Sequence, residues 1–116
     1  MLDKNDLGNF VVSASTMADA SGELIRREQE KNFETQIKGD GSPVTSVDKA
    51  AEMVIRAIID ELHPDHGIFG EEYGASGADR EFIWVIDPID GTLPFLAGFP
   101  VFGTLLALLH NGAPVL

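Results

Sequence analysis

The sequence contains no cysteine among its 116 residues. This absence excludes a disulfide framework, a thiolate nucleophile and a zinc–thiolate cluster, and it suits a reducing compartment. The first ten residues, MLDKNDLGNF, are polar and mixed in charge, which excludes a signal peptide, and no apolar run reaches membrane-spanning length. We therefore expect a soluble cytoplasmic protein with no membrane partner, organised as one domain or a piece of one.

Basic residues are scarce in the second half of the chain. Through Arg56 there are ten acids and seven Lys and Arg, whereas from Ala57 onward there are nine acids and a single base, Arg80. An acidic surface of this kind repels nucleic acid and phosphorylated ligands unless cations intervene. We therefore expect no nucleic-acid partner, and if this half binds a phosphate, we expect divalent ions beside it.

Two helices are predicted ahead of a group of strands. A loose apolar stripe predicts a first helix from about Leu7 to Glu30. The second helix has clearer signals, because Thr45 is a good N-cap and Asp48 follows three residues later as a capping-box acid. This helix is expected to end before Pro64. Its buried face is predicted to comprise Val47, Ala51, Val54, Ile58 and Leu62.

The rest of the chain indicates short strands. We predict them at Gly67–Phe69, Phe82–Ile86 and Val101–Leu109. Asn111-Gly112 is a strong hairpin signal, so the following residues, APVL, are predicted to begin a returning strand. Because the sequence stops inside this apolar strand, we expect residues 1–116 to be the front portion of a longer domain.

Two aspartates follow the predicted strand in the stretch WVIDPIDGT. Pro88 has no N–H to donate, so the backbone is expected to turn directly after Asp87, and this turn brings Asp90 back toward Asp87. Together with the carbonyl of Ile89, the two carboxylates form an all-oxygen cluster suited to Mg²⁺. Glu71, at the end of the preceding strand in IFGEEYG, is placed to complete it.

A phosphate site is predicted beside this cluster. Thr92 can cap a short helix, and the backbone N–H groups of Gly91 and Thr92 would then point at a bound anion. A metal and a helix N-terminus that face the same point suit phosphoryl chemistry.

Each element also has a purely structural interpretation. Asp90-Gly91 can form an ordinary hairpin turn, Asp48 can be only a helix cap, and Glu71 and Glu72 can be solvated loop acids. The pair His63 and His66 suggests zinc, but a histidine near a helix C-terminus is the simpler interpretation.

Taken together, the motifs FGEE and WVIDPIDGT, with SPVTSVDKAAE upstream, resemble the double signature of the inositol monophosphatase family of Mg²⁺-dependent, lithium-sensitive phosphatases. The resemblance covers essentially the whole chain and corresponds to the N-terminal half of that family. It implies a layered α/β fold, with two helices packed on a largely antiparallel sheet, and usually a homodimer. Each complete site would hold two or three Mg²⁺ ions.

The resemblance also implies roles for particular residues. The metal ligands would be Glu71, Asp87, the carbonyl of Ile89, and Asp90, and Glu71 would also act in catalysis. Thr92 would position the attacking water, and Asp48 would accept a hydrogen bond from Thr92. The amides of Gly91 and Thr92 would hold the phosphate.

The implied substrate is a small phosphate monoester. The stretches FPVFGTLLALLHNGAPVL and SPVTSVDKAAE look closest to the histidinol-phosphate phosphatase branch, while similar relatives process inositol and other polyol phosphates or 3′-phosphoadenosine nucleotides. The family supplies a further metal-ligating aspartate from its C-terminal half. A non-catalytic interaction module, or an inactive fragment of such a phosphatase, is the alternative.

Overall fold

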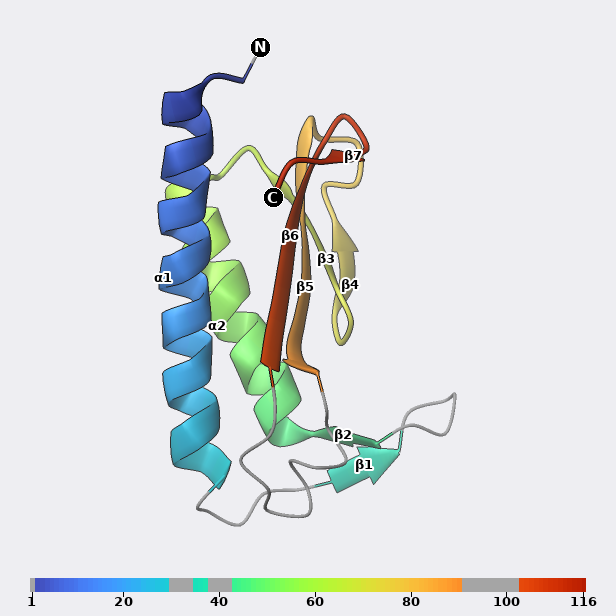
Figure 1. Cartoon of the computed structure of the whole chain (residues 1–116). Helices are drawn as coiled ribbons and strands as arrows, with labels where there is room; N and C mark the ends of the chain where they lie inside the picture. The colour runs from blue at the N-terminus through green and yellow to red at the C-terminus, as the bar shows by residue number, and fades with distance from the viewer. Residues whose placement is uncertain (1, 30–34, 38–42, 91–102) are drawn as a thin grey trace.

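The computed structural model describes residues 2–29, 35–37, 43–90 and 103–116, and it places two helices on the same side of a five-stranded sheet (Figure 1). The helices are α1, Lys4–Gln29, and α2, Ser46–Leu62. The strands of the sheet are β3 (Gly67–Gly70), β4 (Gly74–Ser76), β5 (Phe82–Asp90), β6 (Gly103–His110) and β7 (Ala113–Pro114). A separate pair, β1 (Thr35–Ile37) and β2 (Pro43–Thr45), lies ahead of α2.

The sheet is mixed but mostly antiparallel, with the strand order β4-β3-β5-β6-β7. β3 and β5 run parallel to each other, and the other neighbouring pairs are antiparallel. This arrangement confirms the layered α/β fold that the resemblance implies. The carboxyl ends of β3 and β5 and the N-terminal end of α2 lie at the same end of the molecule (Figure 1).

Helix α1 begins three residues earlier than the apolar stripe suggested, because its first turn is capped by a reciprocal pair of aspartates. The amide of Asp6 donates to a carboxylate oxygen of Asp3 at 2.8 Å, and the amide of Asp3 donates to Asp6 at 3.1 Å. These two bonds satisfy amides that a helix start would otherwise leave without partners.

The core forms between the helices and one face of the sheet. Side chains alternate along a strand, so Trp84 and Ile86 of β5 face the helices, while Val85 and Asp87 face the opposite side. The buried cluster comprises Phe10, Met17, Ile55, Ile59, Ile68, Trp84, Ile86 and Leu108.

The buried face of α2 differs from the predicted one. The predicted stripe shares Val47 and Ala51 with the buried face, but Leu62 is 47% exposed. Apolar residues cover a wider part of the α2 surface than the predicted stripe. Packing on the sheet buries those that are spaced by four residues, Val47, Ala51, Ile55 and Ile59. The residues buried along α2 are Val47, Asp48, Ala51, Glu52, Ile55 and Ile59.

The expectation that the chain turns directly after Asp87 is wrong. β5 continues through Pro88 to Asp90, with a shift in its register against β6 between Asp87 and Asp90. Pro88 lacks only a donor, and a bulge of this kind accommodates that loss while the strand goes on. Among the described helices, neither is long and apolar enough to cross a membrane.

Candidate active site

Two of the predicted metal ligands, Glu71 and Asp87, follow neighbouring positions of the parallel strands. Gly70 of β3 is in register with Ile86 of β5, so Glu71 and Asp87 are the next residues on each strand. The amide of Glu71 donates to the carbonyl of Ile86 at 3.4 Å, which continues the link between the two strands past Gly70. The sequence suggested that strand ends of one sheet could bring these two acids together, and the register of β3 and β5 places them side by side.

Both acids line one hollow on the face of the sheet opposite the helices. The hollow has a volume of about 500 Å³, and its wall is formed mainly by apolar side chains of β3, β5 and β6, such as Phe69, Val85 and Leu105. This volume lies within the range of small-molecule pockets. The hollow therefore has an apolar wall beside an edge that carries two acids.

The bulge after Asp87 is tied to α1 and β6 by a chain of hydroxyls. Thr104 Oγ1 donates to the carbonyl of Pro88 at 2.8 Å, and Ser21 Oγ lies 3.2 Å from Thr104 Oγ1. Since Thr104 has one hydroxyl proton and uses it on Pro88, Ser21 donates to Thr104. Ser21 is fully buried. The sequence analysis missed both hydroxyls, because they come from elements far from Pro88 in the chain.

The remaining predicted site residues are described only in part. The backbone of Ile89 and Asp90 belongs to β5, and Asp90 is in register with Gly103 of β6. Gly91 and Thr92 lie outside the described residues, as do the predicted short helix and the phosphate-binding amides.

Asp48 lies in the first turn of α2 and is only 3% exposed. Burial at this depth is unusual for a helix-capping acid, which normally stays near solvent. The position of Asp48 at the site end of the molecule is compatible with both the capping and the catalytic interpretation.

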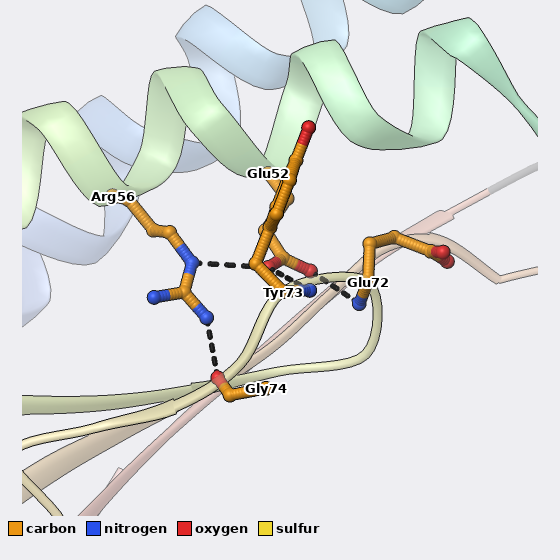
Figure 2. A network of polar contacts seen from close by, with 5 residues as sticks. All are labelled: Glu52, Arg56, Glu72, Tyr73 and Gly74. Atoms are coloured by element: carbon orange, nitrogen blue, oxygen red, sulfur yellow. Dashed lines mark hydrogen bonds and ion pairs between the residues drawn. The ribbon is translucent and has the colours of Figure 1, made fainter.

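Figure 2 shows a network that the sequence analysis did not anticipate, centred on Glu52 of α2. The Glu52 side chain is fully buried, and its carboxylate accepts hydrogen bonds from the amide of Glu72 at 2.8 Å and from that of Tyr73 at 2.9 Å. Arg56 Nε donates to the same carboxylate at 3.0 Å, and Arg56 Nη2 donates to the carbonyl of Gly74. In the sequence, Glu52 directly follows Ala51 of the apolar row of α2. Its burial was not predicted, because the predicted buried face of the helix was rotated away from the face that packs on the sheet.

The donor set fits a hard divalent cation. Glu71 and Asp87 could offer carboxylate oxygens, the ligands that Mg²⁺ prefers, and none of the described residues that line the hollow carries sulfur or imidazole. In the part of the chain that the structure describes, no group of three His, Cys, Asp or Glu residues is arranged to hold a metal. The side chain of Asp90 lies outside that part, so the two described acids form a partial ligand set.

Two helices on one side of a mixed sheet, whose two parallel strands lie side by side, define a layered α/β domain. Residues 6–116 match the model of the inositol monophosphatase family, and the chain belongs to this family.

Two of the proteins to which the chain is similar are named as phosphatases. It is 45% identical over 117 residues to the chloroplastic bifunctional phosphatase IMPL2 of Arabidopsis thaliana, covering 99% of this chain and 34% of that protein. It is 39% identical over 102 residues to the histidinol-phosphatase of Mycobacterium tuberculosis, covering 87% of this chain and 39% of that protein. The structure of the extragenic suppressor protein suhB from Bartonella henselae superposes with a TM-score of 0.87 at 28% identity, covering 92% of this chain and 43% of that one. The chain thus spans between 34% and 43% of the length of these relatives.

Proposed function

We propose that this chain supplies a Mg²⁺ site for the hydrolysis of a small phosphate monoester. The observation that carries the proposal is that Glu71, the residue after β3, lies beside Asp87 of the parallel strand β5, on the edge of one hollow. Asp90 and the carbonyl of Ile89 would join them as ligands, with two or three ions in a complete site. Membership of a generally Mg²⁺-dependent phosphatase family supports this assignment.

In this proposal, each residue of the site has its own role in the hydrolysis. Mg²⁺ would supply charge neutralisation at the phosphoryl group and would lower the pKa of water at the site. Thr92 would orient the attacking water through its hydroxyl, and Asp48 would accept the hydroxyl proton of Thr92 in a hydrogen bond. The amides of Gly91 and Thr92 would hold the phosphate oxygens. The proposed roles of Thr92 and Asp48 rest on the family motif.

We propose histidinol phosphate as the first substrate to test, followed by inositol 1-phosphate. A histidinol-phosphatase among the relatives supports this order. Because the chain spans less than half of its relatives' length, we infer that residues 1–116 act as the N-terminal portion of a phosphatase domain and that turnover needs further residues. We also propose a cytoplasmic homodimer for the complete domain, which light scattering and cell fractionation can test.

The metal site is tested by calorimetric titration of the 116-residue chain with Mg²⁺ and Mn²⁺. Asp87→Asn should weaken binding at least tenfold, since it removes a charged ligand. Asp79→Asn, at an exposed acid in the turn before β5, is the matched control and should bind as the wild type does. Equal affinities for the two variants would contradict the assignment of Asp87.

Catalysis is tested by phosphate release from both esters. The assay compares two proteins. One is this chain alone, and the other is this chain fused to the part of IMPL2 that lies outside the matched region. We expect Mg²⁺-dependent release by the joined protein, lost in Asp87→Asn. If Mg²⁺ binds but no ester is hydrolysed by either protein, the chain is a metal-binding interaction module and the catalytic proposal is wrong.

A further inference from the structure

The turn that carries Glu71 is held from two sides. On the sheet side, the amide of Glu71 donates to the carbonyl of Ile86, the residue before Asp87. On the helix side, the amides of Glu72 and Tyr73 both donate to the carboxylate of Glu52. Three successive amides of one short turn thus have identified acceptors, one on β5 and two on α2.

Arg56 extends the contact to the end of the turn. It sits one helical turn after Glu52 and pairs with it, while its other nitrogen reaches the carbonyl of Gly74, where β4 begins. The guanidinium carbon also lies 6.0 Å from the centre of the Tyr73 ring. Glu52 and Arg56, which we call the turn clamp, therefore contact each residue from Glu72 to Gly74 (Figure 2).

Gly70 leaves room for the carboxylate of Glu52 in the turn clamp. A Cβ at this position would overlap the carboxyl group of Glu52, so only glycine lets the carboxylate lie against the end of β3. The glycine in FGEE is thereby explained by a close approach rather than by an unusual backbone angle.

Stability alone is a poor explanation for the turn clamp. A fully buried carboxylate has a large desolvation cost, and apolar residues of similar volume often replace a buried ion pair with no loss of stability. What an apolar pair would not supply is acceptors for two turn amides and a donor for a turn carbonyl. Those bonds restrict where the backbone on either side of Glu71 can lie.

We propose that Glu52 and Arg56 are positioning residues, which hold the Glu71 turn beside Asp87 so that both carboxylates reach one cation. This proposal rests on the proposed function of Glu71 and Asp87 as metal ligands. Residues that orient metal ligands typically change metal affinity by about 10- to 100-fold when they are mutated.

The test compares Mn²⁺ affinity, measured by calorimetry on the 116-residue chain, for Glu52→Gln and Glu61→Gln. Both changes remove one negative charge from α2, but Glu61 is exposed, so it controls for long-range electrostatics. Glu52→Gln should weaken Mn²⁺ binding by about 10-fold or more, and Glu61→Gln by less than about 2-fold. The loss of Mn²⁺ affinity in Arg56→Lys should lie between the losses in these two variants, because lysine keeps the positive charge but lacks the several N–H donors of the guanidinium.

A second comparison separates positioning from a general loss of stability. Ile59→Val removes a methylene from the same helix, away from the turn, and should lower stability without changing Mn²⁺ affinity. Hydrogen exchange at the amides of Glu72 and Tyr73 should accelerate in Glu52→Gln and stay slow in Ile59→Val.

The outcomes distinguish the two proposals. If the wild type binds no Mn²⁺, or if Asp87→Asn binds it as well as the wild type does, the proposed function fails and the turn clamp fails with it. If Asp87→Asn weakens binding but Glu52→Gln retains wild-type affinity, the metal site stands and the turn clamp is only structural.

Discussion

Two histidines at the end of α2 belong to an aromatic cluster. The rings of His63 and His66 stack at 4.5 Å with an angle of 4° between their planes, and Phe10 packs edge-on against both. Trp84 Nε1 donates to His66 Nδ1 at 3.1 Å, which requires that nitrogen to be unprotonated. Burial, followed by the charge of His63, lowers the pKa of His66 to about 4, and burial also lowers the pKa of His63.

This cluster predicts a stability that falls in mild acid. Because the folded-state pKa of His66 is below its unfolded value of 6.5, the unfolded chain binds more protons between about pH 6.5 and pH 4, so stability falls as the pH falls through that window. The expected loss from this residue stays below about 2 kcal/mol on going from pH 7 to pH 5, because the ring is only partly buried and solvent screens part of the effect. Urea unfolding at the two pH values measures it.

His66→Gln supplies the comparison for that measurement, because glutamine can still accept from the Trp84 indole but does not titrate. The difference in stability between pH 7 and pH 5 should shrink in this variant. An unchanged difference would show that other groups, such as protonating carboxylates, cause the acid sensitivity.

The sequence predicted only part of this environment. His63 does follow directly on α2, and its amide donates to the carbonyl of Ile59 at 2.7 Å. A helix C-terminus favours a charged imidazole. The structure instead surrounds His63 with Phe10, His66 and Trp84, and burial outweighs the helix end. Phe10 comes from α1 and Trp84 from β5, and no local pattern reveals that these two residues contact His63.

At the scale of elements, the hairpin between β6 and β7 was predicted correctly. Asn111 and Gly112 adopt positive φ angles of 51° and 85°, as an Asn-Gly type I′ turn requires. The two strands also pair as expected, with His110 opposite Ala113. A turn of this type depends on its own two residues, so the sequence is sufficient to predict it.

Two glycines provide a matched pair of substitutions with opposite effects. A Cβ would meet nothing within 4 Å at Gly112 or at Gly8 of α1, so the two sites differ chiefly in backbone conformation. Gly112→Ala should destabilise by about 1 kcal/mol because φ is positive there. Gly8→Ala should stabilise by about 0.5 to 1 kcal/mol, because alanine has the better helix propensity.

Thermal unfolding of the two variants beside the wild type measures both effects. Shifts of the same sign would mean that the backbone conformation at one of the two positions differs from that described.

The buried face of α2 shows where element-level prediction failed. Apolar residues occur on more than one row of this helix, so periodicity identified a helix but did not identify the row that packs against the sheet. The correct row places Asp48 and Glu52 inside the protein, where each needs polar partners. Besides Arg56, the partners of Glu52 are the amides of Glu72 and Tyr73, 20 and 21 residues away in the chain, in the turn after β3.

At the scale of the whole molecule, charge dominates. A net charge of −11 on 116 residues repels itself, so added salt should raise the melting temperature by screening. Mg²⁺ should raise it further than NaCl does at the same ionic strength if a specific site exists. The additional stabilisation is about 1.4 kcal/mol when Mg²⁺ is present at about ten times its Kd.

Differential scanning calorimetry in NaCl and in MgCl₂ of matched ionic strength separates the two effects. Asp87→Asn should keep the response to NaCl and lose the extra response to Mg²⁺. Equal stabilisation of the wild type by the two salts would indicate screening alone.

The sequence by itself determined the two helices, the main strands and the Asn-Gly hairpin. Each of these follows from short-range periodicity or from turn chemistry. Only the tertiary structure decided that β5 continues through Pro88, that Glu52 binds the turn carrying Glu71, and that His63 and His66 stack in an aromatic cluster. These features depend on which surfaces of distant segments meet, and the cost of leaving buried polar groups without partners then selects their contacts.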